Sequence, residues 1–311
     1  MMEEKNKIAL LIIFNHRFDK NIPRLEEIYR NKFSNIFFVV PFYDGDKENV
    51  IPVYYNSFYF EGYIAQAYQH IKDKGFTHYF FVADDMIINP QITEDSIFNF
   101  LGITPEKSWI DVIFDCKTRP HHWRVPLFIN LDKAGIEVRK MLPSVEDVTK
   151  KFDKYGLSYY PSRWYAFIEL LKHLRPHRHC PKAVVHSLSY LFRFDLYELR
   201  KLQNYYPGIW GSADILLVPA KNMDKFAQYC GIFAGLRVFV ETAIPYSLLL
   251  TSDEVVTTDK TNLKTVRQIF AMEDGYEDQF NEKYNFNLDK LLTDYPKDVI
   301  YIHPVKLSKW K

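Results

Sequence analysis

Three short, continuously apolar segments in the first third of the chain constrain its fold most strongly. They cover residues 7–14 (KIALLIIF), 35–40 (NIFFVV) and 77–83 (THYFFVA). Strands that are buried on both faces have unbroken apolar runs of this kind, which is typical of parallel sheets covered by helices. Between the runs, apolar residues recur at helical spacing, as in 61–74, and Gly75 then ends the helix. The alternation predicts an α/β fold with a mixed, largely parallel sheet flanked by helices.

The rest of the chain favours one domain. Its 311 residues are enough for a single large α/β core. We find no internal repeat, low-complexity tract or linker, so we expect a single domain over 1–311, with a helical insertion at about 140–205.

Composition excludes several classes of function. The 40 basic and 39 acidic side chains give a net charge of +1, so we expect no nucleic-acid partner. The three cysteines form no CxxC pair, and the only N-terminal apolar run, 8–14, is too short to span a membrane. We therefore expect a cytoplasmic protein. The basic, aromatic segment 163–182 is compatible with contact to a membrane surface or an anionic glycan, and equally with a solvated surface helix.

Two adjacent carboxylates, Asp84 and Asp85, directly follow the apolar run 77–83. In open α/β sheets, ligands bind outside the carboxyl ends of the strands. Adjacent carboxylates repel each other, but their oxygens suit a hard divalent cation. Taken alone, the pair fits a solvated turn equally well.

With these segments in place, the chain resembles the nucleotide-sugar glycosyltransferases of GT-A fold. KIALLIIFNHR, NIFFVVPFYDG and HYFFVADDM look like the first, second and fourth strands of that family's Rossmann-like half. The resemblance covers about 7–100 and returns at 208–250 and in the C-terminal tail. It implies that 1–105 bind the nucleotide sugar and 106–311 the acceptor. The family's hallmark is an acidic motif after the fourth strand, and Ala83 stands where many relatives have its first acid.

The resemblance implies a bound Mn²⁺ or Mg²⁺ with Asp84, Asp85 and His303 as its ligands. Asp85 would contact the metal, and Asp84 would bind the ribose or reach the metal through water. The tail segment IHPVKLSKW is similar to one that supplies a third ligand and a diphosphate contact in several families, mostly retaining ones. His303 and Lys306 hold those two places here. A histidine at a strand end is by itself more often structural; beside the acid pair, we favour a ligand.

The remaining site predictions concern nucleotide and acceptor. Phe14, Asn15, His16 and Asp44 follow the first two strands, where relatives bind the base and ribose.

Two further acids are candidates for catalysis. Glu241 interrupts an apolar run, where a carboxylate is costly unless it is paired or functional. Asp214 follows the glycine-containing turn 208–213, beside Trp210, whose ring could stack on a sugar. By the resemblance, Glu241 would contact the acceptor or act as general base. Asp214 could bind sugar hydroxyls of the donor or the acceptor, and in an inverting reaction either acid would act as the base. The alternatives are a bond to a helix N-terminus or a salt bridge to Arg237 for Glu241, and a turn cap for Asp214.

We therefore expect a metal-dependent glycosyltransferase that moves a sugar from a nucleoside diphosphate, by family frequency UDP, to a hydroxyl of a glycan or lipid-linked saccharide. The late histidine favours a retaining reaction. One alternative is a nucleotidyltransferase, which would be expected to have a glycine-rich phosphate loop after the first strand; FNHRFDKN has no glycine. Another is a non-catalytic glycan-binding protein, for which Ala83 is the hint.

Overall fold

The computed structural model describes residues 7–115, 128–131, 135–157, 205–267 and 282–311, with isolated positions between 167 and 188. The main strands are β1 (Ile8–Ile13), β2 (Asn35–Pro41), β3 (Val50–Val53), β4 (His78–Ala83), β6 (Ser108–Ile110), β11 (Ile215–Pro219) and β12 (Val255–Thr257). The main helices are α1 (Ile22–Tyr29), α2 (Glu61–Ile71), α3 (Ile97–Leu101), α5 (Val145–Lys154), α8 (Ala220–Gly235), α9 (Val240–Thr251) and α11 (Leu288–Thr293). Shorter elements are β5 (Ile87–Ile88), β7 (Ile113–Phe114), β8 (Phe128–Asn130), α4 (Ile136–Met141), β9 (Tyr205–Pro207), β10 (Trp210–Gly211), β13 (Lys264–Arg267) and β14 (Val299–His303).

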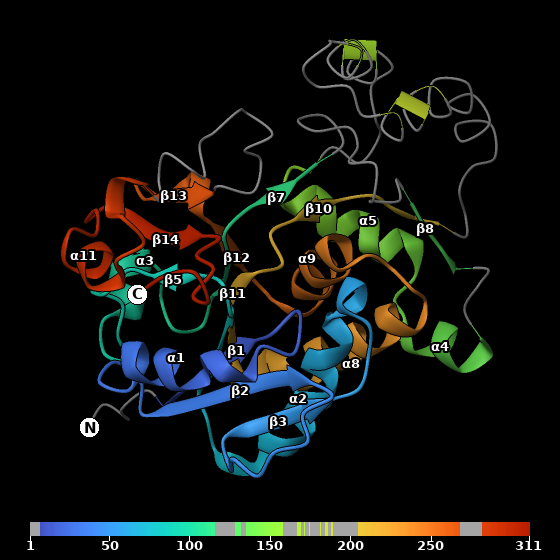
Figure 1. Ribbon diagram of the computed structural model, residues 1–311. Helices are drawn as coiled ribbons and strands as arrows, with labels where there is room; N and C mark the ends of the chain where they lie inside the picture. Colours follow the sequence, from blue (N-terminus) through green and yellow to red (C-terminus); the bar gives the residue numbers. More distant parts are fainter. Residues whose placement is uncertain are drawn as a thin grey trace, which may run out of the picture.

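The seven main strands form one sheet in the order β12-β6-β11-β4-β1-β2-β3 (Figure 1). β1 pairs in parallel with β2 and β4, β2 with β3, and β12 with β6. β11 is antiparallel to both of its neighbours, β4 and β6. β4 and β6 therefore run in the same direction, and the carboxyl ends of all the parallel strands lie at one edge. β11 begins at that edge.

Alternate residues of the central strands pack into two different cores, as the period of two in a strand requires. Leu11 of β1 packs on the face covered by α2, α8 and α9. Leu10 and Ile12 pack on the opposite face, against α1, α3, α11 and β14. Figure 1 shows these two helical layers on either side of the sheet. Burial on both faces explains why β1, β2 and β4 are continuously apolar.

A small second sheet returns the C-terminal part of the chain to the end of β4. It has the order β13-β14-β5, and β14 pairs antiparallel with β5 through Tyr301 opposite Ile88 and Ile302 opposite Ile87. β5 begins two residues after Asp85, so this pairing sets the end of β14 beside the acid pair. The last strand thus lies next to a segment more than two hundred residues earlier.

The observed architecture confirms the predicted α/β class, with a largely parallel sheet between helices. The predicted helical insertion at about 140–205 is described only in part, chiefly by α5 and the last two residues of α4. None of the described helices combines the length and apolar character needed to cross a bilayer. The basic segment 163–182 lies largely outside the described residues.

Glu61 is a buried carboxyl group that the sequence pattern did not reveal. Glu61, in the first turn of α2, is 0% exposed, and neither of its side-chain oxygens has a hydrogen-bond partner among the described residues. Burial raises the pKa of Glu61 to about 9, so it holds a proton at neutral pH. Glu61 also raises the pKa of the buried Cys230 thiol of α8, for which burial is the larger cause.

Candidate active site

The acid pair lies at the carboxyl end of β4, as the sequence predicts. Asp84 is buried, with 7% of its surface exposed, and its N–H donates to the Ile13 carbonyl of β1 at 3.0 Å. Burial and, next, the neighbouring Asp85 carboxylate raise the pKa of Asp84 to about 8, while a hydrogen bond from the Asn15 backbone N–H opposes them. The surroundings of Asp84 therefore hold too little positive charge to stabilise its ionised form.

His303 contacts the pair directly. Its Nε2 lies 2.9 Å from Asp85 Oδ1, a contact between residues 218 positions apart. Its Nδ1 is buried and has no hydrogen-bond partner among the described residues. Burial acts to lower the pKa of His303, but the hydrogen bond to Asp85 and the charges of Asp214 and the acid pair outweigh it and raise the pKa. The imidazole thus partly compensates the local negative charge.

The chain after His303 stays attached to the site. The peptide bond between His303 and Pro304 is cis, and the Val305 N–H donates to the Asp85 carbonyl at 2.6 Å. Lys306 follows immediately and is exposed. The predicted contact of Lys306 with a diphosphate stays a prediction.

Asp214 approaches from β11, which begins at this edge. Its carbonyl accepts a hydrogen bond from the Ala83 N–H at 2.8 Å. Burial is the main cause that raises the pKa of Asp214; the charge of His303 lowers it, and that of Asp85 raises it further. The structure therefore brings together Asp84, Asp85, His303 and Asp214, all of which the sequence analysis selected.

Ala83 now has a physical explanation. It is 5% exposed and belongs to the apolar cluster that includes Met86, Phe80 and Ile12. A carboxylate at this position would enter that cluster without a partner, which is unfavourable. The position therefore fits an apolar side chain, and the site instead receives Asp214 from the neighbouring strand.

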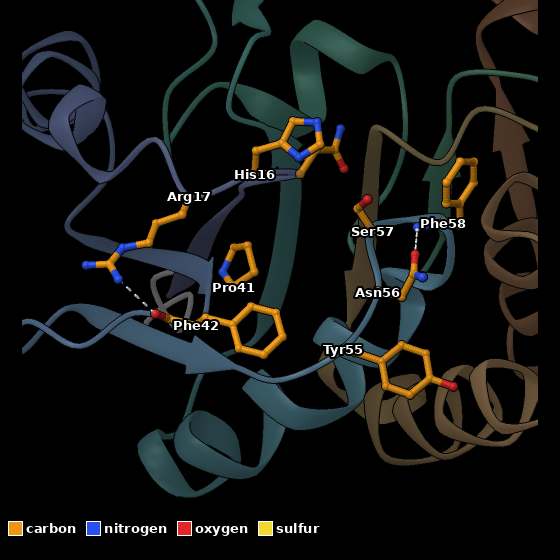
Figure 2. A pocket seen from close by; sticks show the side chains of 9 residues that line it. His16, Arg17, Pro41, Phe42, Tyr55, Asn56, Ser57 and Phe58 are labelled. Carbon is orange, nitrogen blue, oxygen red and sulfur yellow. Dashed lines mark hydrogen bonds between the residues drawn. The ribbon is translucent and has the colours of Figure 1, made fainter.

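A cavity of about 800 Å³ opens at the ends of β1, β2 and β3 (Figure 2). It is lined by Asn15, His16, Arg17, Pro41, Phe42 and the segment Tyr55, Asn56, Ser57 and Phe58. Asn15 also donates its backbone N–H to the Asp84 carboxyl group. The cavity therefore adjoins Asp84 through the backbone of Asn15.

The most unusual residue of this cavity is Phe42. Its φ of 54° places a non-glycine residue in the left-handed region, which is unfavourable for a large side chain. Its ring is 59% exposed and packs edge-on against Tyr54, with ring centroids 5.9 Å apart. Figure 2 shows this ring beside Pro41 at the opening, with Tyr55 and Phe58 across from it. Exposed aromatic rings in a cavity suit a flat ligand such as a nucleobase.

The four residues predicted to contact the nucleotide differ in their position relative to the cavity. Asn15 and His16 line the cavity. Phe14 is fully buried and packs against Phe38 with centroids 6.3 Å apart, so only its backbone could face a ligand. Asp44 is exposed and accepts a hydrogen bond at 3.1 Å from Arg17, which lines the cavity. Phe42 and Tyr55 were not predicted from the sequence; for Phe42, the available signal was the turn-forming residues Pro, Asp and Gly of 41–46 (PFYDGD).

Trp210 was predicted to stack on a sugar and Glu241 to contact the acceptor; the structure contradicts the first prediction and leaves the second untested. Trp210 is 7% exposed and packs on Phe114 with centroids 4.4 Å apart, so its ring is not open for stacking on a sugar. The prediction for the Trp210 ring is therefore wrong. Glu241 lies in the first turn of α9, which packs against β10. Its role in catalysis stays a prediction.

The donor set fits a divalent cation in its chemistry. Two carboxyl groups and an imidazole suit Mg²⁺ or Mn²⁺, and the raised pKa of Asp84 shows that added positive charge would be stabilising. Within the described ranges, however, no three His, Cys, Asp or Glu side chains stand in an arrangement that holds a metal. Asp85 Oδ1 instead contacts His303.

Comparison with known proteins does not assign the chain to a family. No family model and no curated protein matches the chain. Among solved structures, the mannosyltransferase Ktr4p from S. cerevisiae in complex with GDP is similar over 80% of this chain and 67% of its own, with 12% sequence identity and a TM-score of 0.35. At that score and identity, the likeness carries no inference about this chain.

Proposed function

We propose that this chain is a glycosyltransferase that uses a nucleoside diphosphate sugar as donor, with UDP as the expected nucleotide, and a hydroxyl of a saccharide or lipid-linked saccharide as acceptor. One observation carries the proposal. Asp84 and Asp85 from the end of β4, Asp214 before β11 and His303 from β14 meet beside an aromatic cavity of about 800 Å³. A nucleotide sugar has a flat base, a diphosphate and a sugar, and the site offers a place for each.

The cavity residues would bind the nucleoside. Phe42 and Tyr55 offer ring faces for the base, and stacking of a base on an aromatic ring contributes about 1–3 kcal/mol. Asn15 and His16 line this cavity, and the Asn15 backbone also contacts Asp84. The diphosphate would then lie toward Asp85 and His303.

Asp84, Asp85 and His303 would hold Mn²⁺ or Mg²⁺. When bound, the ion would neutralise the charge that develops on the departing diphosphate. A pKa of about 8 keeps the Asp84 carboxyl group protonated at neutral pH. To become a metal ligand, it would therefore have to release that proton. Lys306 would add positive charge on the side of the leaving group.

The acceptor hydroxyl must lose a proton during transfer. In an inverting reaction Asp214 or Glu241 would take it as general base, whereas a retaining reaction requires no such base. The segment at His303 and Lys306 favours retention by its resemblance to retaining families. The anomeric configuration of the product, read by NMR, tests this point.

Thermal unfolding with nucleotides tests the donor side of the proposal. We expect UDP, or another nucleoside diphosphate from a panel, to raise the Tm of the full chain only when Mn²⁺ or Mg²⁺ is present. Asp85→Asn should lose this stabilisation. The matched control is Asp73→Asn, which changes an exposed carboxylate at the opposite edge of the sheet. Absence of any metal-dependent shift across the panel would contradict the proposal.

A further inference from the structure

Residues 304–311, the C-terminal segment, follow β14 and carry Lys306. Burial alternates at its start: Val305 is 0% exposed and Leu307 2%, whereas Lys306 between them is exposed. The Val305 N–H donates to the Asp85 carbonyl at 2.6 Å. The backbone therefore holds Lys306 next to a residue that contacts the acid pair.

The C-terminal segment forms a turn that begins at Lys306. The Lys309 N–H donates to the Lys306 carbonyl at 2.8 Å, and the Trp310 N–H donates to the Leu307 carbonyl at 3.2 Å. Trp310 is 4% exposed, and its ring packs edge-on against Phe286 with centroids 6.0 Å apart. The position of Lys306 therefore depends on how firmly this turn is held.

Arg24 binds this turn from α1, in the first half of the chain. Its Nη1 donates to the Leu307 carbonyl at 2.8 Å and also to the Trp310 carbonyl. Arg24 and Leu307 are 283 positions apart in the sequence. Leu25, the next residue of α1, belongs to the same apolar cluster as Leu307. Arg24 is thus a polar link between α1 and a segment that shares its apolar cluster.

Arg24 directs a full positive charge at neutral acceptors. Its guanidinium is half-buried and binds no carboxylate among the described residues. Removing a charge even partly from water is unfavourable, and the two carbonyls of the turn offset that cost. Hydrogen bonds from a charged donor are stronger than those between neutral groups. Arg24 should therefore stabilise the turn more than either backbone hydrogen bond within it.

His303 is held in a different way from Lys306. It ends β14, which pairs with β5 through Tyr301 and Ile302, and its imidazole contacts Asp85 directly at 2.9 Å. None of these contacts involves Arg24. Loosening the turn should therefore release Lys306 while His303 stays beside the acid pair.

We propose that Arg24 is a positioning residue of the active site, which holds the turn at Lys306 so that the ammonium group is directed at the diphosphate of the donor. The proposal rests on the glycosyltransferase function and on the role of Lys306 proposed above. Arg24 does not touch the donor and acts only through Lys306. Because charge develops on the diphosphate as it departs, the effect of Arg24 falls on kcat and not on donor binding.

Hydrogen exchange on the full chain, read by mass spectrometry, tests the attachment of the turn without any substrate. Arg24→Gln removes the charge and suits a helix, and Arg24→Lys keeps the charge without the planar donor group. Arg30→Gln is the matched control, because Arg30 is exposed and directly follows α1. We expect peptide 304–311 to exchange about ten-fold faster in Arg24→Gln, less so in Arg24→Lys, and at the wild-type rate in Arg30→Gln. Equal rates in all four chains would overturn the proposal, and the Tm of each variant checks its folding.

Turnover of a sugar nucleotide tests whether Arg24 acts through Lys306. Arg24→Gln should lower kcat about ten-fold, as for a misplaced catalytic group, while the donor KM and the affinity for Mn²⁺ stay unchanged. Arg24→Lys should recover part of this loss. In a Lys306→Ala chain, Arg24→Gln should cause no further loss, because the group through which it acts is absent. Additive losses, or a fall in Mn²⁺ affinity, would indicate a general structural role and overturn the proposal.

The same variants separate failure of this proposal from failure of the function itself. Turnover that Lys306→Ala lowers and Arg24→Gln leaves intact would overturn only the role of Arg24. Turnover that Lys306→Ala leaves intact would overturn the roles of both residues and leave the transferase function standing. Absence of turnover with every donor in the wild-type chain would overturn the function, and the role of Arg24 with it.

Discussion

Replacing Glu61 by glutamine should remove a large pH dependence of stability. Glu61 is 0% exposed, and its pKa is raised to about 9 from an ordinary 4.5, with burial as the first cause. The folded state therefore holds the proton over a pH range in which the unfolded chain has released it. A raised carboxyl pKa contributes stability that is complete below pH 4.5 and is lost as pH rises toward 9.

The magnitude follows from the two pKa values. Each pH unit between them costs about 1.4 kcal/mol, so the contribution of Glu61 falls by about 4 kcal/mol from pH 5 to pH 8. Urea unfolding at several pH values measures the free energy of unfolding of the wild-type and Glu61→Gln chains. The difference between the two profiles isolates Glu61, because other shifted groups, such as Asp84, are common to both chains.

The control is Glu27→Gln, which changes an exposed glutamate on α1. Its profile should run parallel to that of the wild type, while the Glu61→Gln profile should diverge upward as pH rises. Parallel profiles for wild type and Glu61→Gln would refute the conclusion that Glu61 is protonated in the folded protein.

Three further predictions concern the site. Gly211→Ala should lower stability by about 1–3 kcal/mol and reduce acceptor transfer, because its Cβ would lie 2.2 Å from the Val112 carbonyl. Gly235→Ala, whose Cβ would meet nothing within 4 Å, should be tolerated. Thermal unfolding and transfer assays check both variants. Phe42→Ala should weaken nucleoside diphosphate binding about ten-fold or more, and Phe42→Trp should largely restore it, as measured by calorimetry. Mn²⁺ binding should release about one proton from Asp84 at pH 7, and the affinity for Mn²⁺ should fall as pH drops below 8. Calorimetry in two buffers of different ionisation enthalpy measures the proton release.

The fold was predictable where local pattern and burial agree. β1, β2 and β4 are covered on both faces, so each appears in the sequence as an unbroken apolar run. The position of β11 was not predictable in the same way. It lies between β4 and β6 and antiparallel to both, which depends on pairing across more than a hundred residues and not on its own sequence.

The site shows the same division. The contact between Asp85 and His303 was predictable because Asp85 follows β4, His303 ends β14, and the family that the sequence resembles joins such residues. The cavity beside them depends on the left-handed backbone at Phe42, which a turn-forming sequence permits but does not specify. Glu61 was hidden for another reason. A glutamate in the first turn of a helix is ordinarily an exposed, favourable residue, whereas α2 packs against α8 and Glu61 is buried.

Turnover of a sugar nucleotide tests the central claim most directly. The assay measures release of the nucleoside diphosphate from a panel of sugar nucleotides by the full chain, with Mn²⁺, with Mg²⁺ and with a chelator. We predict metal-dependent release from at least one donor, a loss of about a hundred-fold or more in Asp85→Asn and in His303→Ala, and no change in Asp73→Asn. Release from no donor, or release that both site variants leave intact, would contradict the account.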